Sequence, residues 1–296
     1  MTMPFPPFEP DAEPAEEAGN GARRRRLREI PLRAIFPSLI TLLAIGSGLT
    51  AIRFAAEGKV GLAIGAIVLA GFLDGIDGRV ARFLKSTSRF GAELDSLADF
   101  VNFGVAPALI VYFALLDGLR SFGWIAALIY AVCVCLRLAR FNVMLDRADV
   151  PKWQAAFFVG VPAPAGAGLV MLPVYVRLLG VPDSVPLDLA AAFYTVAVGL
   201  MMVSRMPTWS GKDFGQRIPR TQVLPVFILV VGFVAFLLSY PWATLIVCAL
   251  AYLASIPFAW RDWRRRRAAA EAVAGAAPLA ALPPAGTRID GGDRIG

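Results

Sequence analysis

The sequence contains no histidine and only three cysteines among its 296 residues. The absence of histidine excludes Ser-His-Asp and Cys-His nucleophilic machinery, histidine general bases and the usual imidazole-rich zinc sites. Cys133, Cys135 and Cys248 lie within apolar stretches, and their spacing indicates neither a disulfide framework nor a metal site. Any chemistry must therefore use carboxylates, arginine, lysine or tyrosine.

Charged residues are also scarce, at 17% of the chain, whereas 57% of the residues are hydrophobic. Soluble domains have about a quarter charged and about half apolar residues. Several apolar segments are long enough to cross a hydrocarbon core of about 30 Å. The sequence therefore predicts an all-α fold, a polytopic transmembrane helical bundle of about eight spans. The eight segments are residues 35–54, 60–78, 96–116, 122–140, 155–176, 187–204, 222–239 and 242–259.

The basic residues are distributed unevenly between the two sides of the predicted bundle. If the chain starts inside the cell, only four of the 29 basic residues lie on outward loops, namely Arg53, Lys59, Arg120 and Arg177. Because cytoplasmic flanks carry an excess of lysine and arginine, both termini are expected in the cytoplasm and the protein in the cell membrane. The net charge of +7 then suits anionic lipid headgroups of the bilayer, and no nucleic acid is expected as a partner.

The predicted transmembrane catalytic domain occupies residues 35–262 and is flanked by polar segments. Residues 1–22 are rich in Pro, Glu, Ala and Gly and are expected to be a disordered tail without a cleavable signal. Residues 23–34 form a basic juxtamembrane segment, which fits a short interfacial helix and a topogenic charge run equally well. Residues 263–296 are expected to be basic at first and then disordered.

Four aspartates lie where the second and third predicted spans meet. The second span ends in D-G-I-D-G-R-V-A-R (residues 74–82), and the third begins with G-A-E-L-D-S-L-A-D (residues 91–99). Asp74 and Asp77 are three residues apart, and Asp95 and Asp99 are four apart, so each pair lies on one helical face. Carboxylates at membrane depth repel one another and need partners. Two interpretations remain open, a structural ion network with nearby Arg and Lys residues, or a cation site.

An all-oxygen site without histidine or cysteine favours Mg²⁺ or Mn²⁺. Two such ions can bridge a pyrophosphate and offset its negative charge. The complete pattern is D-x-x-D-G-x-x-A-R, eight further residues, and G-x-x-x-D-x-x-x-D, with every fixed position filled. This pattern resembles the signature of the CDP-alcohol phosphotransferase family of membrane enzymes. The resemblance implies a six-helix catalytic core, a homodimer, and transfer of a phosphoryl-linked group from a CDP-linked donor to an alcohol with release of CMP.

Further stretches resemble the bacterial, membrane-integral phosphatidylserine synthases within that family. They are residues 93–107, 136–143 and 158–167. Glycerophosphate-using relatives usually have Pro and Lys where this chain has Ser96 and Phe100. The resemblance therefore implies CDP-diacylglycerol and L-serine as substrates. One departure is Ser38, which stands where many relatives have Asn.

The resemblance also implies roles for the four aspartates. Asp74, Asp77 and Asp95 would bind divalent cations, Mg²⁺ or Mn²⁺ and two in number. Asp99 would complete the second metal site and act as the general base. A serine hydroxyl is a weak nucleophile, so it needs a proton acceptor within hydrogen-bond reach.

Two further sets of residues are candidates for substrate contacts. The nucleotide and phosphate candidates are Thr41, Gly78, Ala81, Arg82 and Gly91. Small residues let a nucleotide approach the backbone, although small residues also serve close helix packing. The acceptor candidates are Asn102, Arg137, Arg140 and Asn142. A guanidinium suits the carboxylate of serine, whereas position alone favours arginines that snorkel or set topology.

Two other functions remain as alternatives. Another acceptor, such as choline, inositol phosphate or glycerophosphate, would keep the enzyme class and change the substrate. A transporter would be expected to carry its acids near the midplane of broken or repeated helices, whereas these acids cluster near the cytoplasmic end.

Overall fold

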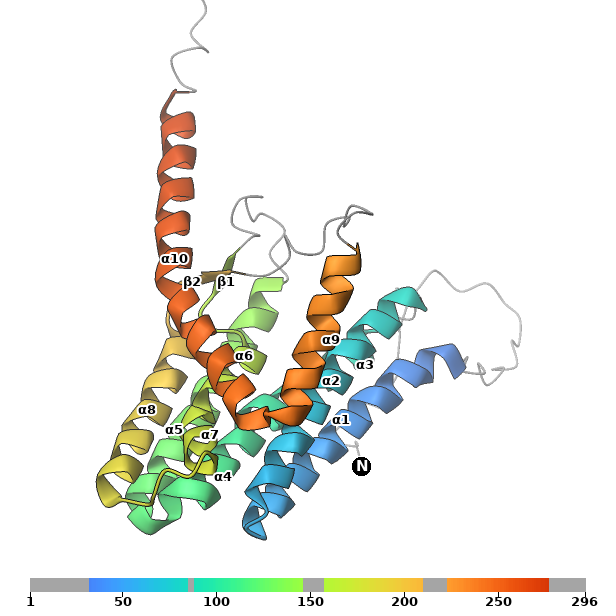
Figure 1. Cartoon of the computed structure of the whole chain (residues 1–296). Coiled ribbons are helices and arrows are strands. Elements are labelled where there is room, and N and C mark those ends of the chain that lie inside the picture. The colour runs from blue at the N-terminus through green and yellow to red at the C-terminus, as the bar shows by residue number, and fades with distance from the viewer. Residues whose placement is uncertain (1–31, 85–87, 146–156, 210–222, 277–296) are drawn as a thin grey trace, which may run out of the picture.

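The computed structural model describes residues 32–84, 88–145, 157–209 and 223–276, and these form a bundle of helices with a small two-stranded sheet (Figure 1). The predicted all-α, polytopic fold is thereby confirmed. The elements are α1 (Leu32–Ala56), α2 (Val60–Phe83), α3 (Arg89–Asp99), the π-helix η1 (Phe100–Val105), α4 (Ala106–Val111), the π-helix η2 (Tyr112–Leu116), the 3₁₀ turn η3 (Asp117–Leu119), α5 (Ser121–Leu145), β1 (Phe157–Val159), α6 (Ala163–Val170), α7 (Leu172–Leu178), α8 (Val185–Val203), β2 (Pro207–Trp209), α9 (Val223–Ser239) and α10 (Pro241–Ala276).

Each of the eight predicted apolar segments overlaps a helical run. Within the described ranges, six runs are long and apolar enough to cross a membrane, and two apolar helical runs are shorter. The six are Phe36–Ala56, Val60–Phe83, Arg89–Leu119, Ser121–Met144, Val185–Val203 and Pro241–Glu271, and the shorter two are Ala163–Leu178 and Val223–Ser239. The third run begins seven residues before the predicted start at 96, because the charged residues of α3 lower its hydropathy without preventing a helix.

The start of the fifth predicted segment, residues 155–176, is wrong. Residues Phe157–Val159 form β1, which pairs antiparallel with β2 in the register Phe157 to Trp209 and Val159 to Pro207. Gly160 follows with φ +83°, and α6 begins only at Ala163, with a proline in its first turn. Proline is well suited to the first turn of a helix, and a preceding helix cannot continue through it without losing a hydrogen bond. Hydropathy alone does not distinguish this strand and turn from a helix.

The C-terminal boundary also differs from the expectation. Helix α10 continues past residue 262 to Ala276, so the first part of the predicted tail, residues 263–276, is helical. The sequence there is rich in Arg, Ala and Glu, which are good helix formers. Ion pairs one turn apart, Asp262 with Arg266 at 3.1 Å and Arg267 with Glu271 at 2.7 Å, support the extension. The disorder expected for residues 1–22 and for the end of the chain falls outside the described residues.

Helices α1 and α2 pack closely because small residues lie between them. Ala44, Ala51 and Ala63 are completely buried, and the Ser47 hydroxyl donates to the Ala66 carbonyl oxygen at 2.7 Å. Small residues at such an interface let two backbones approach, and dispersion contacts then hold them in lipid. The close approach brings the start of α1 against the end of α2, where Asp74 and Asp77 lie.

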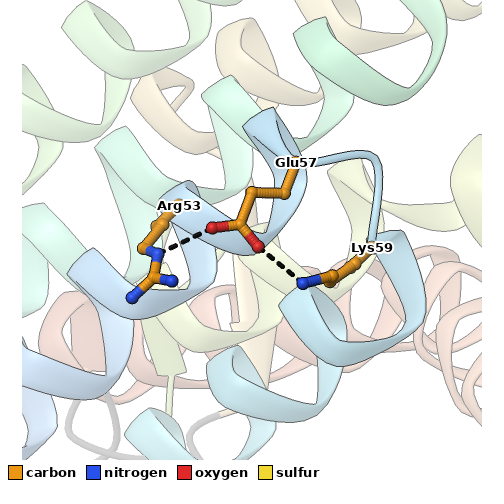
Figure 2. Close-up of polar contacts among 3 residues, drawn as sticks. All are labelled: Arg53, Glu57 and Lys59. Carbon is orange, nitrogen blue, oxygen red and sulfur yellow. Dashed lines mark hydrogen bonds and ion pairs between the residues drawn. The ribbon is translucent and has the colours of Figure 1, made fainter.

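The turn between α1 and α2 lies at the end of the bundle opposite to the end of α10 (Figure 1). In this turn Glu57 accepts hydrogen bonds from Arg53 at 2.7 Å and from Lys59 at 2.8 Å (Figure 2). The bonds from Lys59 and Arg53 lower the pKa of Glu57. At the same end Arg177 pairs with Asp183 at 2.5 Å and with Asp188 at 3.8 Å. Three of the four basic residues on the predicted outward loops, Arg53, Lys59 and Arg177, are thus paired with local acids.

Replacement of Gly160 by alanine is expected to destabilise the fold, because φ is positive and the new Cβ would overlap the Met202 carbonyl oxygen. The loss should exceed about 1 kcal/mol. Gly168→Ala is the matched control, since a Cβ there meets no atom within 4 Å. Thermal unfolding of both variants in detergent would measure the effect, and equal midpoints would contradict this account of the turn.

Candidate active site

Three carboxylates from α2 and α3 converge at the end of the bundle that carries the start of α1. Each of Asp74, Asp77 and Asp95 offers an oxygen, and these oxygens lie within 4.8 Å of one another. Asp74 and Asp77 occupy one face of α2, as their spacing predicts, and Asp95 faces them from α3. Like charges at this separation repel one another. The group can hold a divalent metal ion, whose charge would remove the repulsion and whose preference is for oxygen ligands.

Two hydrogen bonds fix the orientation of the Asp77 carboxylate. Thr41 of α1 donates its hydroxyl to Asp77 Oδ2 at 2.6 Å, and the Gly78 amide donates to Asp77 Oδ1 at 2.5 Å. Both oxygens are therefore oriented by protein donors while their remaining lone pairs stay available. Such supporting bonds orient metal ligands in proteins. Asp77 is 3% exposed, so its direction is also determined by packing.

A cavity of about 280 Å³ opens beside Asp77 and Asp95. All five predicted nucleotide and phosphate residues line it: Thr41, Gly78, Ala81, Arg82 and Gly91. Arg82 is exposed, and its Nε donates to the Gly78 carbonyl oxygen at 3.1 Å, which leaves the terminal nitrogens of the guanidinium for another ligand. The cavity therefore combines carboxylates for a cation with a guanidinium for a phosphate.

Ser88 is a cavity residue that the sequence analysis missed. Its side chain caps α3 by accepting from the Gly91 amide at 3.0 Å, and it also lines the cavity. The first turn of α3 thus borders the cavity, and the positive end of a helix dipole favours an anion. A serine just before a helix is a typical N-cap. The sequence nevertheless predicted that this span starts at residue 96, seven residues after the observed start at Arg89. Ser38, at the position that departs from the family pattern, lines the cavity as well.

Asp99 lies at the end of α3, where the chain changes to the π-helix η1. Its carboxyl group contacts that of Asp74, and Arg137 lies within electrostatic range on α5. Asp99 is outside the closely spaced group of three acids. The wider turn of η1 resets the helical register after Asp99, and short π-helical segments often occur at functional sites. Asp99 therefore contacts the acid group through Asp74 and lies within electrostatic range of Arg137.

Two predicted acceptor residues, Asn102 and Arg137, are buried with polar atoms left free. Asn102 is 0% exposed, and neither its Oδ1 nor its Nδ2 has a hydrogen-bond partner in the described part of the chain. Arg137 is 8% exposed, its Nε has no such partner either, and its guanidinium lies 5.8 Å from the centre of the Phe141 ring. Gly48 of α1 faces Asn102 so closely that a Cβ would overlap the amide. Buried polar atoms without partners are rare and commonly indicate a ligand or ordered water.

The other two acceptor candidates are bound to protein groups. Arg140 donates to the Val203 carbonyl oxygen at 2.8 Å and to those of Ser204 and Val159 at 3.2 Å each. It therefore caps the end of α8 and holds β1. Asn142 donates from Nδ2 to the Ser96 hydroxyl at 3.0 Å. The structure thus brings Asn102 and Arg137 to the side of Asp99, and it gives Arg140 and Asn142 contacts that connect helices.

The comparison with known protein families agrees with this geometry. Residues 34–203 match the model described as CDP-alcohol phosphatidyltransferase, and residues 222–257 match the model described as CDP-alcohol phosphatidyltransferase 2. The chain belongs to the CDP-alcohol phosphatidyltransferase family and is a membrane-embedded transferase.

Similar proteins carry a more specific name, CDP-diacylglycerol–serine O-phosphatidyltransferase. The protein of Mycobacterium leprae is 40% identical over 252 residues, which cover 82% of this chain and 80% of the relative. The Helicobacter pylori (strain 26695) protein is 34% identical over 226 residues, covering 74% and 88%. The Methanocaldococcus jannaschii protein is 31% identical over 213 residues, covering 71% and 87%.

Removal of divalent cations should lower the thermal stability of the protein, and Mg²⁺ or Mn²⁺ should restore it, because the three acids repel one another without a cation. Asp95→Asn should lose most of the metal-induced shift. In chelator this variant should unfold at the same temperature as the parent or a higher one, since one repelling charge is gone.

Glu57→Gln is the matched control for this experiment, because it removes an acid at the opposite end of the bundle. It should keep the full metal-induced shift. A shift of equal size in Asp95→Asn would show that the cation binds elsewhere.

Proposed function

We propose that the protein transfers the phosphatidyl group of CDP-diacylglycerol to the hydroxyl of L-serine, forming phosphatidylserine and releasing CMP in phospholipid biosynthesis. The observation that carries the proposal is the position of Asp99, whose carboxyl group contacts that of Asp74 in the acid group and lies within electrostatic range of the buried Arg137. A proton acceptor, a site for phosphate charge and a cationic group for a carboxylate are therefore adjacent. The names of the relatives support serine as the acceptor.

The donor is proposed to bind in the cavity beside Asp77. The guanidinium of Arg82 and the first turn of α3 would face its phosphates, and Gly78 and Ala81 would leave room for the nucleotide. Two divalent cations held by Asp74, Asp77, Asp95 and Asp99 would supply positive charge to the pyrophosphate and the leaving CMP. We propose Mg²⁺ or Mn²⁺ because the donor set is all oxygen.

Asp99 is proposed to accept the proton of the serine hydroxyl as its oxygen attacks the phosphorus attached to diacylglycerol. The bond from that phosphorus to the bridging oxygen of CMP breaks, and CMP leaves with this oxygen as a phosphate oxyanion. No covalent enzyme intermediate is needed, because the acceptor attacks directly. Arg137 would hold the serine carboxylate, and Asn102 would contact the same substrate from η1.

We further propose a homodimer in the cell membrane with both termini in the cytoplasm. The orientation is supported by the balance of charge at the end that carries Glu57, Asp183 and Asp188, where acids offset the basic residues. The opposite end carries an excess of basic residues, namely Arg79, Arg82, Arg89 and the run Arg264 to Arg267, of which Arg266 and Arg267 pair with Asp262 and Glu271. The active site would then face the cytoplasm, where serine and CDP-linked donors are available.

Purified protein in liposomes with CDP-diacylglycerol should form product with L-serine in preference to ethanolamine, choline, inositol, inositol phosphate and glycerol 3-phosphate. Ethanolamine lacks the carboxylate, and a buried guanidinium left without its partner disfavours such a substrate. Release of CMP and the identity of the lipid product would be measured together. Efficient transfer to glycerol 3-phosphate or choline, with none to serine, would overturn serine as the acceptor and leave the family assignment intact.

Asp99→Asn should reduce turnover by at least about 100-fold, the usual contribution of a general base. Donor binding should be largely retained, whereas Asp77→Ala should weaken it, because Asp77 lies in the donor cavity. Binding of CDP-diacylglycerol and turnover would be measured on the same folded, metal-loaded preparations. Near-normal turnover of Asp99→Asn would exclude Asp99 as the base.

A further inference from the structure

One face of α1 is buried and follows the site from the donor side inward. Its buried residues are spaced three or four apart, namely Thr41, Ala44, Gly48, Ala51 and Ala55. Thr41 donates to Asp77 beside the donor cavity. Gly48 lies seven residues, about 10 Å, further along the same face. At this depth α1 contacts the π-helix η1.

Gly48 and Asn102 meet where α1 contacts η1. A Cβ on Gly48 would overlap Asn102 Oδ1, and it would lie 3.2 Å from Asn102 Cγ and 3.6 Å from Asn102 Cα. These are the three nearest atoms, so the carbonyl edge of the amide faces α1 and the amide nitrogen lies farther away. The space that Asn102 Oδ1 occupies is therefore the space that any side chain on Gly48 would need.

The π-helix η1 has little room to move away from α1, because α5 and α2 also pack against it. The buried Tyr130 hydroxyl of α5 donates to the Phe103 carbonyl oxygen at 2.9 Å. A Cβ on Gly104 would lie 3.2 Å from Val134 Cγ1 of α5. A Cβ on Gly71 of α2 would lie 3.4 Å from the Phe103 ring. A methyl group added to α1 at this contact would therefore displace the amide rather than the helix.

The Asn102 amide keeps its donor nitrogen available for a ligand. The residue is 0% exposed, and neither polar atom has a hydrogen-bond partner among the described residues. Oδ1 lies against a glycine, whose Cα hydrogens offer at most a weak bond. Nδ2 has two protons to donate. Because a buried donor without a partner is unfavourable, a ligand that completes this site should present an acceptor oxygen.

The carboxylate of serine is the acceptor group that suits Nδ2. Asn102 follows Asp99, the proposed base, by three residues, which is less than one helical turn. Serine has acceptor oxygens in its hydroxyl and its carboxylate, whereas its ammonium group only donates. The hydroxyl oxygen attacks phosphorus in the proposed reaction, which leaves the carboxylate for Asn102. A hydrogen bond to a charged group is stronger than one between neutral groups.

We propose that Gly48 is a positioning residue of the acceptor site, because its missing side chain lets α1 hold the Asn102 amide with Nδ2 free to donate to the carboxylate of serine. This inference rests on the proposed function and adds a residue of α1 to the acceptor side. Gly48 touches no substrate and acts through Asn102. An amide that is already held in place loses little conformational freedom when serine binds.

Gly48→Ala should raise the KM for serine about 10-fold or more, since loss of a bond to a charged group has an effect of that order. The KM for CDP-diacylglycerol should change by less than about 2-fold, because other residues line the donor cavity. Gly46→Ala is the matched control on the same helix, since a Cβ there meets no atom within 4 Å. It should keep both KM values and its thermal midpoint.

Asn102→Ala separates positioning from helix packing, because it removes the amide and makes room for a methyl group. Alone it should raise the KM for serine about 10-fold or more. When Gly48→Ala is added to it, the KM for serine should not rise further, and the thermal midpoint should fall less than it does in the parent, since both residues act through one contact. Stabilisation of the folded protein by added serine is a readout independent of turnover, and both single variants should lose it.

An unchanged KM for serine in Asn102→Ala would overturn the inference, even if Gly48→Ala did not fold. A further rise on adding Gly48→Ala to Asn102→Ala would also overturn it, because Gly48 would then act independently of the amide. Equal rises of both KM values in Gly48→Ala would describe a structural residue instead. Failure of the parent protein to form phosphatidylserine from serine would contradict the proposed function, before any variant is compared.

Discussion

The repulsion among carboxylates gathered at one end of an apolar bundle is the constraint on which the rest of the site depends. Asp74, Asp77 and Asp95 lie within 4.8 Å of one another, and Asp99 contacts Asp74. In a medium of low polarity such charges are not held together by packing alone. Neighbouring donor and cationic groups offset part of this repulsion. Thr41 and the Gly78 amide donate to Asp77, while Arg137 lies near Asp99. The remaining negative charge is what makes the group suited to divalent cations.

Close packing of α1 is the second requirement, because α1 supplies contacts to both halves of the site. Thr41 reaches Asp77 only because small buried residues such as Ala44 and Ala51 bring α1 against its neighbours. Two turns further along, Gly48 leaves the space that the buried Asn102 amide occupies. A side chain at Gly48 would therefore disturb the acceptor side, although the residue has no polar group of its own. Small residues without polar side chains thus determine the positions of Thr41 and Asn102.

Much of the fold, and the gathering of the predicted phosphate residues around one cavity, could be predicted from the sequence, because the signals there are local. Long apolar segments indicate helices, and acids three and four residues apart share a helical face. The cavity is lined by all of the predicted phosphate residues, from Thr41 to Gly91. The strand β1 could not be predicted, since it forms only by pairing with β2, about 50 residues away. The position of Tyr252 beside Thr208 depends on the packing of α10 against β2, which no local pattern reports.

Residue type and spacing alone could not predict which of Arg137 and Arg140 is free to contact a substrate. Both lie on one face of α5, three residues apart, and both are arginines near its C-terminal end. Arg140 uses its guanidinium on the carbonyl groups of Val203, Ser204 and Val159, and so joins α5 to the end of α8 and to β1. Because β1 pairs with β2, this connection also fixes the strand that carries Thr208 beside Tyr252. Arg140 anchors the end of α5, whereas Arg137, one turn earlier on the same face, is buried and has an unpaired Nε in the described part of the chain. That combination suits Arg137 to its proposed role, because a guanidinium already held in place loses little conformational freedom when it binds a substrate.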